Sequence, residues 1–255
     1  MLKLIINADD YGYSRQVNEA VGSLMETGVV TSATLMAGGL YFADAARRSI
    51  DFPQCSFGVH LTLTELAPLT SVDNFRCTGL LGADGRLLTD DKLRRGRPIA
   101  AVKEAVFNEW SLQVKRVLDC GVKVTHFDSH HHVHTIPWLF PTLKRLQKQF
   151  DVRKVRISLN WYYDRAKRPT IWLLLKKRLW NKALRHWHRT TVTDYFMPFQ
   201  WFIYNMAEGK APTSGVAELM VHPGQPHYIE ETQLLRSSWR SEMPCAIDLI
   251  SYHDL

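Results

Sequence analysis

Residues 122–134, VKVTHFDSHHHVH, place a valine-rich segment directly before a cluster of histidines. The apolar pattern over Val122–Asp128 predicts a buried β-strand. Five of the eleven histidines in the chain, and one aspartate, lie in the ten residues that end this stretch. Each imidazole ring needs partners for both of its nitrogens, so a chance cluster is costly to bury. Crowding these rings beside a carboxylate favours a metal site or proton-transfer chemistry.

Three other predicted strands carry polar side chains at or near their carboxyl ends. These strands cover residues 2–8, 56–64 and 216–221, and their polar residues are Asp9 and Asp10, His60, and His222, respectively. Helical apolar spacing separates the strands, and this alternation indicates a parallel α/β fold, either an open sheet or a closed barrel. Active sites in such folds lie at the carboxyl edge of the sheet. The sequence therefore predicts that four separate segments form one site.

The rest of the chain supplies the other elements of a single domain over residues 1–255. We expect further strands over 29–36 and 152–159, helices after Ser14 and over 43–49, 100–120 and 141–150, and a long loop over 65–98. A chain of 255 residues with 45% hydrophobic residues fits one large domain with a substantial core. The four cysteines are scattered without a CxxC pair, which argues against zinc-knuckle and thioredoxin-type sites.

The positive charge of the chain is concentrated in one segment. The net charge is +7, but residues 165–189 contain nine Lys or Arg and no acidic residue, and subtracting these nine charges leaves −2 for the rest. The high isoelectric point is therefore a local property of this segment. No apolar run reaches the ~18 residues of a membrane-spanning helix, and the first residues do not resemble a signal peptide. We expect a cytoplasmic protein.

Each polar motif also has an ordinary structural explanation. Asp9 and Asp10, which precede a glycine, are compatible with a surface turn, although two adjacent carboxylates behind an apolar strand need a cation if they are buried. A lone histidine in a strand, such as His60, is more often structural than a ligand. His222, before Pro and Gly, fits either explanation equally well. Their convergence on one sheet edge favours function, because an Asp, His and His set can bind a divalent metal and leave positions open for water.

Within the histidine run, spacing separates the side chains into groups. Strand alternation places His126, Asp128 and His130 on one face. His134 lies four residues after His130 and shares a face with it wherever the chain turns helical. Five histidines cannot all ligate one ion, so some must support the ligands or contact a substrate. No role is assigned to the two histidines between His130 and Val133.

Four motifs together resemble the YdjC-type carbohydrate deacetylases, a family that includes the chitooligosaccharide (chitobiose) deacetylases. The motifs are Asn7–Gly12, Gly58–Leu63, Thr125–His134 and Val221–Gly224, and they occur in the family's order across most of the chain. The resemblance implies a distorted parallel β/α barrel related to the polysaccharide deacetylases. It also implies metal-dependent removal of acetate from an N-acetylated amino sugar.

The resemblance also implies roles for individual residues. The motif positions of the metal ligands are occupied by Asp10, His60 and His130, that of the catalytic base by Asp9, and that of the acid by His222. Asp9 would accept a proton from a metal-acidified water, and His222 would protonate the departing amine. We expect Asp128 to fix a histidine tautomer, with His126 and His134 as further support or substrate contacts. The cofactor is one divalent ion, Mg²⁺ or Zn²⁺, with Co²⁺ and Ni²⁺ also compatible with these ligands.

Residues 161–202 form a basic, aromatic insertion that departs from the family pattern. Ile171–Leu175 is apolar, and Lys176–Arg178 follows it directly. One interpretation is an insertion packed on the barrel with a solvated basic face. The other is an interfacial helix within 165–189 that docks on anionic lipid at the inner membrane face, which would suit a lipid-linked sugar. Nucleic-acid binding is not expected, because the segment lacks a recognised module. The oligomeric state is left open.

Two other functions are compatible with the same barrel. One is a catalytically silent protein that binds sugars or regulates another protein, and the presence of all five carried-over site residues argues against it. The other is a hydrolase of a different amide or ester. The substrate, whether a free oligosaccharide or a lipid-linked glycan, is left open.

Overall fold

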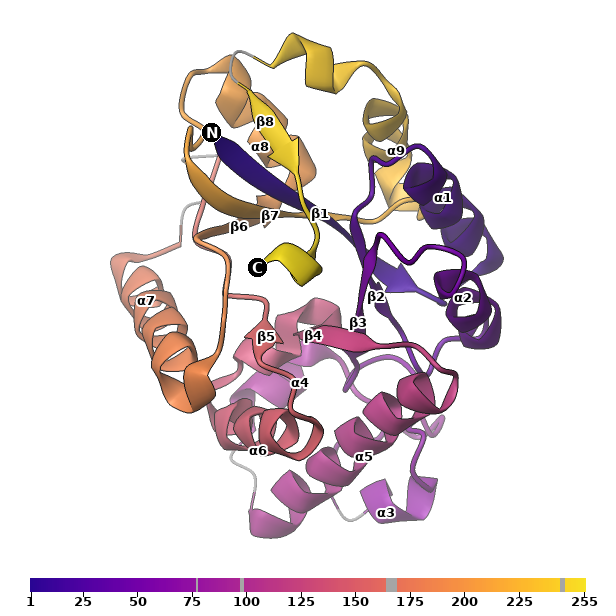
Figure 1. Ribbon diagram of the computed structural model, residues 1–255. Coiled ribbons are helices and arrows are strands. Elements are labelled where there is room, and N and C mark those ends of the chain that lie inside the picture. Colours follow the sequence, from indigo (N-terminus) through magenta and orange to yellow (C-terminus); the bar gives the residue numbers. More distant parts are fainter. Residues whose placement is uncertain (77, 97–98, 164–168, 244–245) are drawn as a thin grey trace.

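A curled parallel sheet forms the centre of the molecule (Figure 1). The computed structural model describes residues 1–255 except 77, 97–98, 164–168 and 244–245. The strands are β1 (Leu2–Tyr11), β2 (Ser32–Leu35), β3 (Ser56–Leu61), β4 (Val124–Ser129), β5 (Lys154–Val155), β6 (Tyr195–Pro198), β7 (Gly215–Val221) and β8 (Ile247–Leu249). Their order is β5-β4-β3-β2-β1-β7-β6, with β8 also paired to β1, and these pairings are all parallel. The predicted α/β class and single domain are confirmed.

The sheet curls until its two end strands approach each other, which makes an incomplete barrel. Lys154 of β5 forms an isolated parallel bridge with Thr191, ahead of β6. Further along, the backbone N–H of Asn160 donates to the carbonyl of Phe196 in β6. Helices surround the outside of the sheet (Figure 1). They are α1 (Arg15–Glu26), α2 (Phe42–Ser49), α3 (Val72–Arg76), α4 (Asp90–Arg95), α5 (Ala100–Asp119), α6 (Phe140–Phe150), α7 (Ile171–His186), α8 (Phe199–Ala207) and α9 (Ile229–Arg236).

Strand β1 shows how the two faces of the sheet differ. Leu4, Ile6 and Ala8 belong to the large core that also holds the helices, whereas Ile5 packs in a separate cluster with Tyr252. Alternate residues of a strand point to opposite faces, so Ile5 and the polar residues after it face the inside of the barrel. Tyr252, near the carboxyl terminus, fills the amino end of this interior, and its backbone N–H donates to the Ser56 hydroxyl at the start of β3. The opposite, carboxyl end of the barrel carries the polar strand ends.

Most of the expected elements are present, and the differences have physical reasons. Ser14 caps α1 as predicted, because its hydroxyl accepts from the N–H of Val17 at 3.2 Å. The expected loop over 65–98 instead contains the short helices α3 and α4. The expected strand over 152–159 keeps only two residues in β5. Beyond them, the backbone N–H of Ser158 donates to a side chain of α7 and not to a neighbouring strand.

Strands β6 and β8 were not predicted. They have four and three residues, too few for an alternating pattern to stand out from the surrounding loops. Cys77 and Cys245, two of the four cysteines, lie outside the described residues. No helix in the described part of the chain has the length and apolar character needed to cross a bilayer.

Candidate active site

Asp9 and Asp10 lie at a bulge near the end of β1. In a regular strand, two adjacent side chains point to opposite faces of the sheet. Here the register of β1 against β2 shifts between Ala8 and Tyr11, and Asp10 adopts a left-handed φ of 60°. A bulge re-aims the side chains around it. As a result, both carboxylates line one cavity of about 380 Å³ at the carboxyl end of the barrel.

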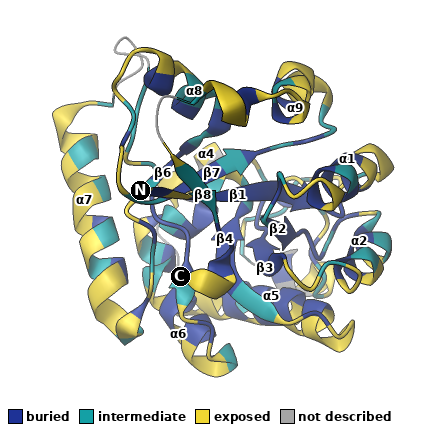
Figure 2. Cartoon of the chain, turned by 45° about the horizontal axis from the view of Figure 1, so that its top comes forward, coloured by how far each residue is buried: buried dark blue, intermediate teal, exposed yellow. Residues whose placement is uncertain are grey.

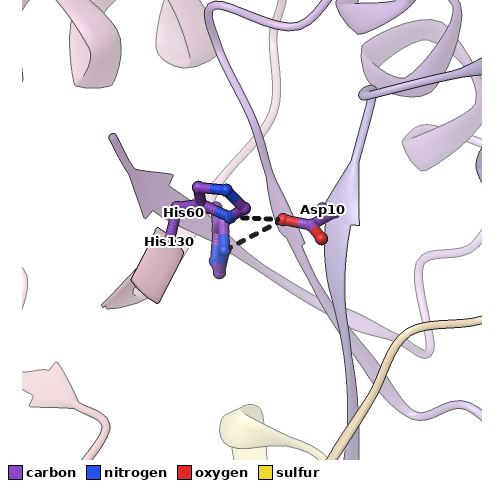
Figure 3. Close-up of side chains that lie close together, drawn as sticks. All are labelled: Asp10, His60 and His130. Atoms are coloured by element: carbon purple, nitrogen blue, oxygen red, sulfur yellow. Dashed lines mark hydrogen bonds and ion pairs between the residues drawn. The ribbon is translucent and has the colours of Figure 1, made fainter. Parts of the chain in front are cut away.

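Asp10, His60 and His130 converge in this cavity (Figure 3). Oδ1 of Asp10 lies 3.2 Å from Nε2 of His60 and 2.9 Å from Nδ1 of His130. One potential ligand atom from each residue lies within 4.8 Å of the other two. The second oxygen of Asp10 accepts from the side-chain amide of Gln225 at 3.1 Å, which fixes the carboxylate plane. The donor set is one carboxylate and two imidazoles, the ligand chemistry of a catalytic divalent-metal site with open positions.

Asp128 supports His60 from behind. The two residues are partners in the β3–β4 register, and Nδ1 of His60 lies 2.8 Å from Oδ1 of Asp128. Donation from Nδ1–H to Asp128 leaves Nε2 directed at Asp10, the arrangement in which a carboxylate orients a metal-binding histidine. Burial lowers the pKa of His60, but the carboxylates of Asp128 and Asp10 outweigh it and raise this pKa to about 10. The two carboxylates therefore favour the protonated form of His60.

Arg156 is the central site residue that the sequence analysis missed. Its side chain is fully buried, and Nη1 and Nη2 donate to the two oxygens of Asp9, both at 2.7 Å. Nη1 also lies 2.8 Å from Oδ2 of Asp128, and Nε donates to Glu218 at 2.7 Å. Burial raises the pKa of Asp9, but the Arg156 guanidinium prevails and holds this pKa well below its usual range. The signal in the sequence was a single cation between two apolar residues in 155–157.

His222, at the end of β7, lies on another side of the cavity. Its ring stacks on Tyr228 with centroids 4.3 Å apart, and its backbone N–H donates to Glu231 at 2.6 Å. Burial lowers the pKa of His222, and the nearby carboxylates of Asp9 and Asp10 only partly oppose this effect. The five residues with carried-over catalytic or ligand roles thus line one cavity, from β1, from β3 and from the segments directly after β4 and β7: Asp9, Asp10, His60, His130 and His222.

The same motifs place the chain among known proteins. The sequence model of the YdjC-like proteins matches residues 3–246. The chain belongs to the YdjC-like family. Among the curated relatives of this YdjC-like protein, a carbohydrate deacetylase of Brevibacillus brevis is 30% identical over 259 residues, which cover 100% of this chain and 93% of that protein. A carbohydrate deacetylase of Geobacillus stearothermophilus is 37% identical over 157 residues, 60% of each chain.

A solved structure agrees with the fold of this YdjC-like chain. A proposed cellobiose-phosphate cleavage protein of Enterococcus faecalis superposes with a TM-score of 0.76, over 99% of this chain and 98% of that chain. The two sequences are 23% identical, so the likeness shows the shared fold alone.

In this YdjC-like protein, the middle of the histidine run forms the cavity rim. His131 and His132 both adopt left-handed φ values of 53°, and Glu65, which faces His130 across the rim, has a φ of 66°. Left-handed residues other than glycine are strained, and such strain is concentrated at functional sites. His132 lines the cavity, and its buried Nδ1 has no hydrogen-bond partner among the described residues. Neither His131 nor His132 had a role that could be predicted from the sequence.

His126 and His134 are fully buried and lie away from the three candidate ligands. Nε2 of His126 is 3.3 Å from the amide oxygen of Asn7, and its ring stacks on Tyr252 at 3.7 Å, deeper in the barrel. Nε2 of His134 lies 3.1 Å from the backbone carbonyl of Arg156. Both histidines therefore contact residues that position Asp9, since Asn7 and Arg156 each donate to its carboxylate.

Proposed function

We propose that this chain is a metal-dependent deacetylase that hydrolyses the acetamide group of an N-acetylated amino sugar. The observation that carries the proposal is the cavity in which an ionised carboxylate, Asp9, lies next to the Asp10, His60 and His130 set. Membership of a family whose curated relatives are named carbohydrate deacetylases supports the same reaction. The sugar, free or lipid-linked, is left open by these observations.

Asp10, His60 and His130 would hold the divalent ion. Their mixed oxygen and nitrogen set suits Zn²⁺ best and is compatible with Mg²⁺, Co²⁺ and Ni²⁺. When bound, such an ion supplies a water of lowered pKa and polarises the acetamide carbonyl. The hydrogen bond between His60 and Asp128 keeps one ring nitrogen free for this purpose.

Asp9 is the base in this mechanism, and Arg156 controls the ionisation and the orientation of its carboxylate. The two hydrogen bonds from the guanidinium keep the Asp9 carboxylate ionised and fix its plane toward the cavity. The same contacts make Asp9 a weak base, because they lower its pKa. A weak base accepts a proton readily only from an acidified water. The Arg156–Asp9 pair therefore fits a hydrolase that uses a metal and argues against one that relies on Asp9 alone.

His222 would donate the proton that the departing amine needs. It approaches the cavity from β7, and Asp9 approaches from β1, the neighbouring strand. Burial lowers the pKa of His222, which makes its protonated ring a stronger acid toward an amine leaving group. Stacking on Tyr228 fixes the ring plane while leaving its edge available for proton transfer.

Acetate release from N-acetylglucosamine oligomers tests the proposal. The purified protein is assayed after chelation and after addition of Zn²⁺, Co²⁺ or Mg²⁺. We expect activity that depends on the metal, is lost in Asp9→Asn and is kept in Asp119→Asn, a matched change of an exposed aspartate at the end of α5. Sugar binding without acetate release by the metal-loaded protein would instead indicate a silent sugar-binding protein. Hydrolysis restricted to other amides or esters would refute the proposed substrate class.

A further inference from the structure

Helix α7 presents an apolar stripe to the outside of the molecule. Ile171 and Trp172 are each 72% exposed, Leu179 is 66% exposed and Leu175 is 43% exposed. With 3.6 residues per turn, these four side chains fall within about 100° of the helix circumference. Figure 2 shows exposed residues along the length of α7, at the edge of the molecule. An ordinary surface helix turns its apolar stripe toward the core, so α7 has the opposite orientation.

The orientation of α7 is fixed by specific contacts on its other side. Trp180 and Leu184 are buried against the domain. The side chain of Asn181 exchanges two hydrogen bonds with the backbone of Ser158, at 2.9 and 3.1 Å. The ammonium of Lys144 in α6 donates to the carbonyl of Leu184 at 3.1 Å, near the carboxyl end of α7. These contacts prevent the helix from rotating to bury its outer stripe.

Positive charges border the stripe and decide what can cover it. Lys176 is on one side of the stripe, Arg178 is on the other, and Lys182 lies within the same arc, just after the last apolar residue of the stripe; all three are exposed. The sequence has no acidic residue between 165 and 189. A second copy of this face would bring like charges together, whereas an anionic lipid surface offers both headgroup charge and an apolar layer. Three further cations of this segment, Arg165, Lys167 and Arg168, lie outside the described residues.

We propose that α7 docks the protein on an anionic lipid bilayer, with the apolar stripe inserted at the headgroup boundary and the bordering cations on the headgroups. The docking helix also contacts the segment that follows β5. The Lys177 ammonium donates to the Tyr162 hydroxyl at 2.7 Å, in the segment that follows β5. The inference does not depend on which reaction the site catalyses.

Vesicle flotation with the full chain tests this proposal. Vesicles of phosphatidylcholine alone are compared with vesicles that also contain phosphatidylglycerol, at low and high salt. We expect binding to the anionic vesicles that weakens at high salt. The double substitution Trp172→Glu and Leu179→Glu should lower partitioning at least about tenfold, because each lost insertion removes a large buried apolar area. Each of Lys176→Gln, Arg178→Gln and Lys182→Gln should lower it roughly fivefold.

The matched control is Ile50→Glu, which adds one charge at an apolar residue 61% exposed at the end of α2. It should bind anionic vesicles like the unmodified chain. The proposal is overturned if the unmodified chain ignores anionic vesicles, or binds phosphatidylcholine equally well. It is also overturned if the Trp172/Leu179 double variant still binds fully. A dimer in light scattering that this variant breaks, without vesicle binding, would identify a second copy as the occupant. Acetate release by the variant from soluble oligomers reports separately on the proposed reaction.

Discussion

Replacing Arg156 with lysine should separate the charge of this buried residue from its geometry. The guanidinium makes four contacts of 2.7–2.8 Å with Asp9, Asp128 and Glu218. Lysine keeps the charge, but a single ammonium cannot span three carboxylates in different directions. Loss of two charge-assisted hydrogen bonds, each worth about 1.5–3 kcal/mol, predicts a destabilisation of about 3–6 kcal/mol. Native domains are stable by about 5–15 kcal/mol, so thermal melting must first show that the variant is folded.

The same substitution should change catalysis in a recognisable way. Without the paired contacts, the Asp9 carboxylate is free to shift, and a misplacement of about 1 Å costs about 100-fold in rate. We expect kcat for acetate release to fall by about this factor while KM changes little, because Asp9 acts on the water and not on the sugar. Since Arg156 holds the pKa of Asp9 down, the acid limb of the pH–rate profile should also move to higher pH.

Glu218→Gln is the matched control for Arg156→Lys. It changes a carboxylate that contacts Arg156 on the side away from Asp9 and leaves the Arg156–Asp9 contacts in place. Its kcat should therefore stay near that of the unmodified chain. A folded Arg156→Lys variant with unchanged kcat and an unchanged acid limb would refute the role assigned to Arg156.

Three further predictions concern metal affinity, the pH dependence of stability and the packing of α7 on the domain. Asp128→Asn replaces the charged acceptor of Nδ1–H of His60 by a neutral amide and should weaken Co²⁺ binding about 10–100-fold in titration calorimetry, and an equal affinity would contradict the supporting role of Asp128. Burial raises the pKa of Glu218 to about 7 from 4.5, so the folded state binds the extra proton between these values and stability falls as pH rises through them. The pKa difference corresponds to a loss of about 3 kcal/mol, and denaturant melts of Glu218→Gln at several pH values should lack it. If the unfolding free energies of the variant and of the unmodified chain fall equally with pH, Glu218 is not the source of the loss. Lys144→Met removes a donor from the Leu184 carbonyl and should cost about 1–3 kcal/mol, with faster tryptic cleavage inside α7, whereas unchanged proteolysis would show that α7 is held without it.

Local patterns in the sequence were sufficient for the α/β class and for the segments that form the site. The valines before the histidine run, the apolar start of β1 and the cap at Ser14 depend on neighbours within one strand or one helical turn. Parallel strands bring their carboxyl ends to one edge, so the polar residues after these strands could be predicted to meet. The short strands β6 and β8 escaped this reasoning, because pairing with neighbours, and not their own pattern, makes them strands.

The sequence by itself determined the α/β class, the four segments whose polar residues meet at one edge of the sheet, and a basic segment with an apolar stretch at α7. Tertiary structure alone decided three features that control what these residues can do. Arg156 meets Asp9 across 147 positions of the chain, the bulge at Asp10 turns adjacent carboxylates to the same cavity, and α7 faces its apolar stripe outward. The reason is the same in each case. A local pattern says which residues share a face, whereas the contacts of distant segments decide where that face points and what it meets.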